Sequence, residues 1–89
     1  MEKKITLVGL SVQELRELAW EHMFLRISVD INNHEGIEGS LRSMNNILKQ
    51  RGYTVSLWRK NLLKYRKAGR LVAITSIIAP ANKVYGVGL

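Results

Sequence analysis

Apolar residues recur at helical spacing near the start of the chain. They lie three or four positions apart, which places them on one face of a helix. Just before them, Ser11 and Glu14 form a capping-box pattern, in which each side chain bonds the backbone N–H of the other residue. The pattern predicts a helix from about residue 12 to residue 24. Its buried face would hold Val12, Leu15, Leu18, Ala19 and Met23.

The periodicity changes after residue 24. Residues 25–31 read Leu-Arg-Ile-Ser-Val-Asp-Ile, an alternation of apolar and polar side chains that predicts a strand with one buried face. Residues 32–36 break this pattern. Helical spacing then returns and predicts a second helix over about 38–51, ended by Gly52. The buried face of this second helix would hold Ile37, Leu41, Met44, Ile47 and Leu48.

A third helix is predicted from about residue 54 to residue 68. Thr54 is a suitable N-cap, and Gly69 is a suitable C-terminal stop. On a helical wheel the core face would hold Trp58, Leu62 and Tyr65. The remaining chain predicts a strand over 71–78, a turn over 79–82 and a returning strand over 83–87.

This order, α-β-α-α-β-β, predicts an α+β winged helix-turn-helix domain with three helices and a small antiparallel sheet. The domain would cover residues 11–89, and residues 1–10 would form an N-terminal arm or a short strand. The early strand at 25–31 matters because a plain three-helix bundle would have no use for it. A winged helix needs it as the third member of its sheet.

Residues 41–72 resemble the second half of bacterial and phage winged helix-turn-helix domains. The same span is similar to helix-turn-helix subdomains at the front of some insertion-sequence transposases. The resemblance covers about a third of the chain, lies at the level of fold, and implies DNA binding through the third helix. The residues that carry it are Leu41, Leu48, Lys49, Gly52, Tyr53, Thr54, Trp58, Leu62, Tyr65, Gly69, Leu71 and Val72.

Charge divides the chain into two unequal parts. Residues 1–38 hold four basic and all seven acidic side chains, a net charge of −3. Residues 39–89 hold ten basic side chains and no acidic one, a net charge of +10. Such a surface attracts a polyanion. The alternative is a basic surface that serves only solubility, although solubility is usually served by mixed signs.

The predicted third helix supplies candidate DNA contacts. The base-reading candidates are Ser56, Arg59 and Lys60, because the first turns of a recognition helix meet the base edges. Leu63 would either touch thymine methyl groups or complete the core. Lys83 would lie near the tip of the wing. The full set of backbone-contact candidates is Arg42, Lys49, Arg51, Lys64, Arg66, Lys67, Arg70 and Lys83.

Catalytic and cofactor sites are not expected. The chain has no cysteine, and its two histidines, His22 and His34, come with no third metal ligand at a recognisable spacing. Glu14, Glu17 and Glu21 follow the spacing of a solvated helix face. We therefore expect no enzyme, no cofactor and no metal. No apolar run is long enough for a membrane span, so a cytoplasmic, nucleoid-associated protein is expected.

The sequence thus predicts sequence-specific binding to double-stranded DNA by a small transcriptional regulator of bacterial or phage type. One alternative is an architectural protein or a recombination or transposition accessory protein, which would bend DNA. Another is a winged-helix adaptor or inhibitor that binds an acidic protein. A homodimer is expected through the N-terminal half, including Ile5, Leu7 and Val8.

Overall fold

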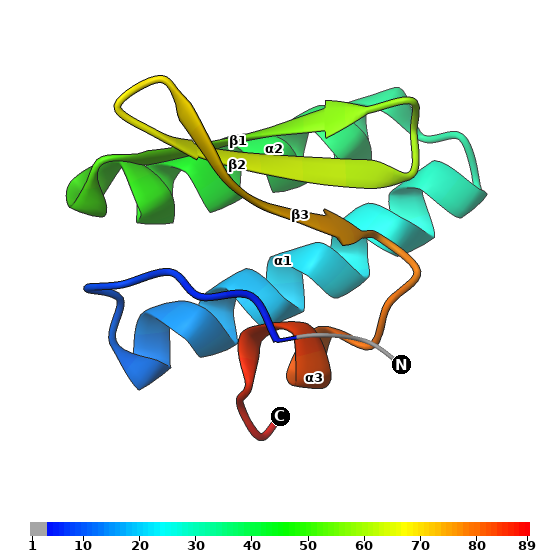
Figure 1. Ribbon diagram of the computed structural model, residues 1–89. Coiled ribbons are helices and arrows are strands. Elements are labelled where there is room, and N and C mark those ends of the chain that lie inside the picture. Colours follow the sequence, from blue (N-terminus) through cyan, green and yellow to red (C-terminus); the bar gives the residue numbers. More distant parts are fainter. Residues whose placement is uncertain (1–3) are drawn as a thin grey trace.

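The computed structural model describes residues 4–89, and it confirms the α+β class. Two helices are followed by a three-stranded antiparallel sheet and a short last helix (Figure 1). In chain order the elements are α1 (Val12–Asp30), α2 (His34–Leu48), the 3₁₀ turn η1 (Lys49–Arg51), β1 (Tyr53–Trp58), β2 (Leu62–Lys67), β3 (Arg70–Ser76) and α3 (Ala81–Tyr85).

Helix α1 is longer than predicted, and the strand predicted at 25–31 is wrong. The capping box is confirmed: Ser11 Oγ accepts from the Glu14 N–H at 3.1 Å, and Glu14 Oε1 accepts from the Ser11 N–H at 2.9 Å. The helix then continues to Asp30 because Leu25 and Ser28 extend the buried face. The intervening Ile27 is exposed, so α1 is apolar on two faces, and this mimics a period of two.

Helix α2 matches the predicted second helix at its core face but begins four residues earlier. Asn33 caps it, with Oδ1 accepting from the Gly36 N–H at 3.1 Å. Met44 and Leu48 are fully buried. Gly52 ends the segment with a φ of 82°, as predicted, although the last residues before it form η1 rather than α-helix.

The recognition helix predicted at 54–68 is wrong, because these residues form a β-hairpin. β1 and β2 pair in antiparallel register, with Val55 opposite Tyr65 and Ser56 opposite Lys64. Burial alternates along β1, with Tyr53 and Val55 buried and Thr54 and Ser56 exposed. That is the period of a strand with one covered face.

β3 joins β2 on its other side, so the sheet order is β1-β2-β3. The predicted strand at 71–78 is therefore largely confirmed. The link between β2 and β3 is Ala68-Gly69, both with positive φ, which is the φ pattern of a type I′ hairpin turn. The register shifts between Tyr65 and Arg66, where β3 carries an extra residue.

The returning strand predicted at 83–87 is also wrong. Pro80 stands before helix α3, Gly86 ends it with a φ of 66°, and Val84 and Tyr85 are fully buried. A short helix buries both side chains on one side, whereas a strand would turn them to opposite faces. α3 packs against α1 beneath the sheet (Figure 1).

The N-terminal segment forms no strand over residues 4–10, and residues 1–3 of the predicted arm lie outside the described residues. The Ile5 N–H donates to the Val84 carbonyl at 2.9 Å. Leu7 is buried in the core and Ile5 is half-buried, so of the three residues expected at a dimer surface only Val8 is fully available. This segment covers the core rather than offering an apolar surface.

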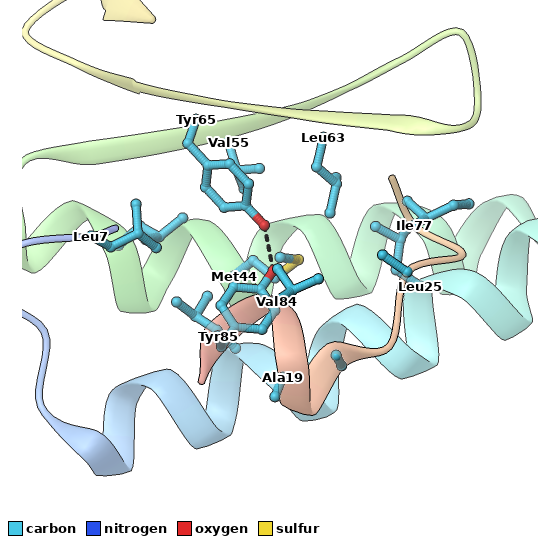
Figure 2. Packing of buried hydrophobic residues seen from close by; sticks show 14 of the residues in the cluster. Leu7, Ala19, Leu25, Met44, Val55, Leu63, Tyr65, Ile77, Val84 and Tyr85 are labelled. Carbon is cyan, nitrogen blue, oxygen red and sulfur yellow. Dashed lines mark hydrogen bonds between the residues drawn. The ribbon is translucent and has the colours of Figure 1, made fainter. Parts of the chain in front are cut away.

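The inner face of the sheet meets the helices in the core, where Tyr65 points toward Tyr85 (Figure 2). The hydroxyl groups of Tyr65 on β2 and Tyr85 on α3 are hydrogen-bonded to each other. Tyr85 also bonds His22 Nδ1 at 3.1 Å, and His22 Nε2 bonds the Ile77 carbonyl at 3.1 Å. A carbonyl can only accept, so Nε2 carries the proton and Nδ1 accepts from Tyr85.

Candidate nucleic-acid interface

One face of the sheet is not covered by any helix. The inner face points toward α2 and α3, and the other face, called here the outer face, meets solvent. Register and burial assign to the outer face Thr54, Ser56, Trp58, Leu62, Lys64, Arg66, Leu71, Ile74 and Ser76. Small polar and cationic side chains therefore stand together on strands β1 and β2, which lie about 4.8 Å apart.

Arg66 is held in place on this face. Its Nη1 donates to Ser56 Oγ at 3.4 Å, across from β2 to β1. A guanidinium positioned beside a hydroxyl presents a planar set of donors with a neighbouring donor or acceptor. This is the chemistry that reads guanine O6 and N7, or grips a phosphate.

The turn between β1 and β2 carries two adjacent cations in strained backbone. Arg59 has a φ of 55° and Lys60 a φ of 64°. Trp58 pairs with Leu62, so the turn has three residues, Arg59-Lys60-Asn61, and positive φ is unfavourable for side chains other than Gly, Asn and Asp. Two side chains with a Cβ in this region cost on the order of 1 kcal/mol or more each. Such strain is concentrated at functional sites, which marks this pair as candidates.

Trp58 lies at the same end of the outer face and is 40% exposed. The Arg59 guanidinium carbon lies 4.0 Å from the centre of the Trp58 ring, and Lys64 Nζ lies 4.1 Å from it. The ring therefore gathers two cations by cation–π attraction. The prediction that Trp58 faces the core is wrong, because β1 directs it outward.

The opposite end of the sheet is also basic. Lys67 and Arg70 flank the β2–β3 turn, and both are exposed. Lys67 Nζ lies 4.9 Å above the Tyr53 ring, at the edge of the inner face. Lys49 and Arg51 in η1 come shortly before β1, whose first residue, Tyr53, pairs with Lys67. Cations thus stand at both ends of strands about 20 Å long.

The structure brings together most of the predicted contact residues, although on a different element. Ser56, Lys64 and Arg66 share the outer face, and Arg59 and Lys60 stand at its edge. Arg42 is exposed on α2, on the far side of the sheet. Lys83 is exposed on α3 beneath the inner face, so its predicted place at a wing tip is wrong.

The helix prediction misplaces residues whose side chains alternate between the two faces of a strand. Leu63 completes the core, which was one of its two interpretations, and Tyr65 is buried as predicted. Leu62 and Trp58 turn to the outer face instead of the core. On β3, Leu71, Val72 and Ile74 are 45–50% exposed and add an apolar strip beside the cations.

Among residues 4–89, the cations of the outer face form no ion pair with a carboxylate. Within residues 4–89 the ion pairs are Arg26 with Asp30 at 3.9 Å and Arg51 with Glu14 at 3.3 Å. A backbone hydrogen bond at Ser11, aided by Arg51, lowers the pKa of Glu14. Arg51 is therefore partly engaged elsewhere. No acidic residue follows Glu38, so the cations of the sheet have no carboxylate partner along their own part of the chain.

No family model matches the chain, and neither a curated protein nor a solved structure matches it.

Away from the outer face, His22, Tyr65 and Tyr85 are titratable side chains buried in the core. Residues 4–89 contain no group of three or more His, Cys, Asp or Glu placed to hold a metal ion. Burial lowers the pKa of His22, while its bond to the Ile77 carbonyl acts in the opposite direction. Burial raises the pKa of both Tyr65 and Tyr85, so these groups stay neutral. None of the helices described has the length and apolar character needed to cross a membrane.

Proposed function

We propose that this protein binds double-stranded DNA through the outer face of its sheet, with the β1–β2 hairpin in the major groove. The observation that carries the proposal is the position of Lys64 and Arg66 on an uncovered sheet face with cations at both ends. The major groove is about 12 Å wide and admits a two-stranded β-ribbon. β-Ribbon proteins read bases from strands in this way.

The side chains of the outer face divide into candidates for base contacts and candidates for phosphate contacts. Ser56 stands in mid-sheet, where a ribbon meets base edges, and the Arg66 guanidinium reaches it from near the end of β2. Arg59, Lys60 and Arg70 stand at the ends, where a ribbon meets phosphates. The exposed apolar side chains of β3 offer contacts to thymine methyl groups. Sequence-specific binding would follow from the mid-sheet contacts, and most of the affinity from the ends.

The cation–π contacts of Trp58 favour duplex DNA over single-stranded DNA as the ligand. Single-strand binding relies on aromatic faces that are free to stack on bases. The ring of Trp58 is already engaged by Arg59 and Lys64. It therefore orients cations rather than offering an open platform.

The winged helix-turn-helix expectation is retained here only in a coarser form, in which consecutive helices precede a small antiparallel sheet. The reading element that we propose is the sheet, since no helix occupies residues 54–68. α2 then acts as a support. Asn45 on α2 accepts from the Val55 N–H at 2.8 Å and donates to the Val55 carbonyl at 3.0 Å, which fixes β1 to the helix.

The test is a polarisation titration of labelled duplex DNA over a series of salt concentrations. About five cations on phosphates predict a slope of log affinity against log salt of roughly −4. The same sequences as single-stranded DNA and as double-stranded RNA complete the comparison. Tighter binding to either of these, or binding that does not respond to salt, would overturn the proposal.

Matched variants separate a defined interface from general basicity. Lys64→Gln with Arg66→Gln removes two charges from the outer face. Arg42→Gln with Lys83→Gln removes two charges from exposed helical positions on the other side of the sheet. We expect the first pair to weaken duplex binding roughly 100-fold and the second less than about 3-fold. Equal losses would contradict an interface on the outer face.

A bending assay addresses the architectural alternative. Apolar side chains inserted between base steps kink DNA, and Leu71, Val72 and Ile74 stand beside the cations. Sequence-specific binding without bending would leave the protein as a reader of the major groove. Strong bending with little sequence preference would favour the architectural role.

A further inference from the structure

Helix α1 is apolar on two opposite faces. Leu18, Leu25 and their neighbours are buried in the core. The opposite side carries large apolar side chains that are 45–66% exposed: Trp20, Phe24, Ile27 and Ile31. A large exposed apolar patch rimmed by polar residues normally marks an interaction site. The outer side of α1, called here the α1 seam, is such a patch.

The spacing of the α1 seam indicates what that partner is. From Trp20 to Ile31 the steps are four, three and four residues, which is the spacing of a and d positions in a coiled coil. This spacing reads the same from either end. A surface with that property fits a second copy of itself turned end over end about a two-fold axis.

We propose that two copies of the chain pair through the α1 seam, with the two α1 helices antiparallel. The two-fold axis passes between Phe24 and Ile27, so each Phe24 packs on the partner's Ile27. Each Trp20 then packs on the partner's Ile31, a large side chain against a smaller one. Trp20 and Phe24 already stack on one another, with ring centres 6.3 Å apart, and form one continuous aromatic surface.

Charge favours the antiparallel direction. The first half of α1 carries Glu14, Glu17 and Glu21 against Arg16 alone, whereas in the second half Arg26 is paired with Asp30. Parallel helices would place each of these glutamates beside its own copy, which is unfavourable. Antiparallel helices separate the two acidic halves and also oppose the two helix dipoles.

The area available is sufficient for a specific dimer. A half-exposed aromatic or branched side chain offers on the order of 100 Å². With Met23, which is 36% exposed, the seam offers about 500 Å² per copy and about 1,000 Å² for the pair, the lower bound for a specific interface. Met23 and Ile27 also line a pocket of about 450 Å³ beside the seam, whose lining includes the apolar Ile77, Pro80 and Leu89 and the charged Arg26 and Asp30.

The dimer does not depend on the proposed function. No residue of the α1 seam belongs to the outer face of the sheet, so the mass can be measured without DNA. We expect sedimentation velocity at micromolar concentration to give twice the 10.2 kDa of one chain. A monomer throughout that range would overturn the proposal and leave the proposed DNA binding untouched.

A charge placed in the seam locates the interface. Phe24→Glu is expected to raise the dissociation constant of the dimer roughly 30-fold or more, because it buries an unpaired carboxylate at the centre of the interface. Ile74→Glu is the matched control, since Ile74 is a similarly exposed apolar residue on β3, the free edge of the sheet. Circular dichroism shows that each variant is folded. Loss of the dimer in Ile74→Glu alone would place the interface at the sheet edge and overturn the proposal.

Cysteine crosslinking tests the direction of the helices, since the protein has no cysteine of its own. A mixture of Trp20→Cys and Ile31→Cys chains is expected to form a mixed disulfide under mild oxidation, because the two positions face each other. Trp20→Cys alone is expected to crosslink slowly. Rapid crosslinking of Trp20→Cys with itself would indicate parallel helices and contradict the proposed arrangement.

Discussion

Arg66 and Ser56 are joined diagonally across two strands of the outer face. Arg66 lies opposite Thr54 in the register, yet its Nη1 reaches Ser56 Oγ at 3.4 Å, one alternation further along β1. Diagonal neighbours in an antiparallel pair are within reach of long side chains. The guanidinium is therefore directed along the sheet toward its centre, where a groove-bound ribbon meets base edges.

This arrangement predicts that Arg66→Lys changes sequence preference without changing the salt dependence of binding. Lysine keeps the charge but loses the planar pair of donors that contacts a guanine in bidentate fashion. We expect the preference for the selected site over a site mutated at one base pair to fall by about 1–3 kcal/mol. Competition titrations with the two duplexes measure it. Retention of the full preference would show that Arg66 contacts only phosphate.

The strained turn at Arg59-Lys60 predicts opposite effects on stability and on binding. Arg59→Asn with Lys60→Gly places residues that accept positive φ at both positions. We expect the free energy of unfolding to rise by about 1–2 kcal/mol. Removal of two cations should at the same time weaken duplex binding about tenfold or more. Chemical denaturation and DNA titration measure the two effects on one sample.

The other hairpin supplies the control for this turn. Ala68 also has a positive φ, of 52°, but carries no charge. Ala68→Asn is expected to stabilise the protein by a few tenths of a kcal/mol to about 1 kcal/mol and to leave duplex affinity unchanged. If this variant weakened binding as much as the charge-removing one, the effect would come from the hairpin geometry rather than from the cations.

The sequence predicts the elements whose local signals agree with their packing. The capping box at Ser11 and Glu14 places the start of α1, and Gly52 places the end of the second helical segment. The apolar periodicity of α2 identifies its core face, including Met44 and Leu48. On α2 one face is apolar and the other polar, so only one period fits the pattern.

Two segments are mispredicted because their patterns fit two periods. α1 is apolar on both sides, and the alternation from Leu25 to Ile31 resembles that of a strand. The sequence pattern fails to predict the β1–β2 hairpin for a different reason. Its turn is Arg59-Lys60-Asn61, with neither Gly nor Pro, so no strong turn signal separates β1 from β2. The cations of residues 59–70 were therefore assigned to a helix, whereas they lie on the β1–β2 turn, on β2 and at the start of β3.

The buried hydroxyl groups of Tyr65 and Tyr85 predict unequal losses of stability. In Tyr65→Phe, the Tyr85 oxygen loses one donor but still donates to His22, so the loss is about 1 kcal/mol. In Tyr85→Phe, both the Tyr65 hydroxyl and His22 Nδ1 lose their partner in the core, and we expect roughly 2–4 kcal/mol. Urea denaturation of the two variants, which remove the same atom type, provides the comparison. A larger loss for Tyr65→Phe would show that the chain of bonds does not pass through Tyr85.

His22 predicts that the protein loses stability in mild acid. Burial lowers the pKa of its imidazole in the folded state, with nearby Arg26 acting in the same direction. The unfolded chain therefore binds the proton more readily, and stability falls as the pH drops below the ordinary histidine value of 6.5. One proton limits the slope of stability against pH to about 1.4 kcal/mol per pH unit.

A second group, Glu21, titrates at lower pH in the opposite sense. Burial raises its pKa in the folded state, so its protonation stabilises the fold as the pH falls. The contribution of His22 is therefore measured as a difference between variants. His22→Gln keeps a donor for the Ile77 carbonyl and an acceptor for Tyr85 but cannot titrate. Urea denaturation between pH 7 and pH 5 should show that its free energy of unfolding depends less on pH than that of the unmodified protein. His34→Gln, at an exposed histidine, is the control, and an unchanged slope in His22→Gln would assign the acid sensitivity to another group.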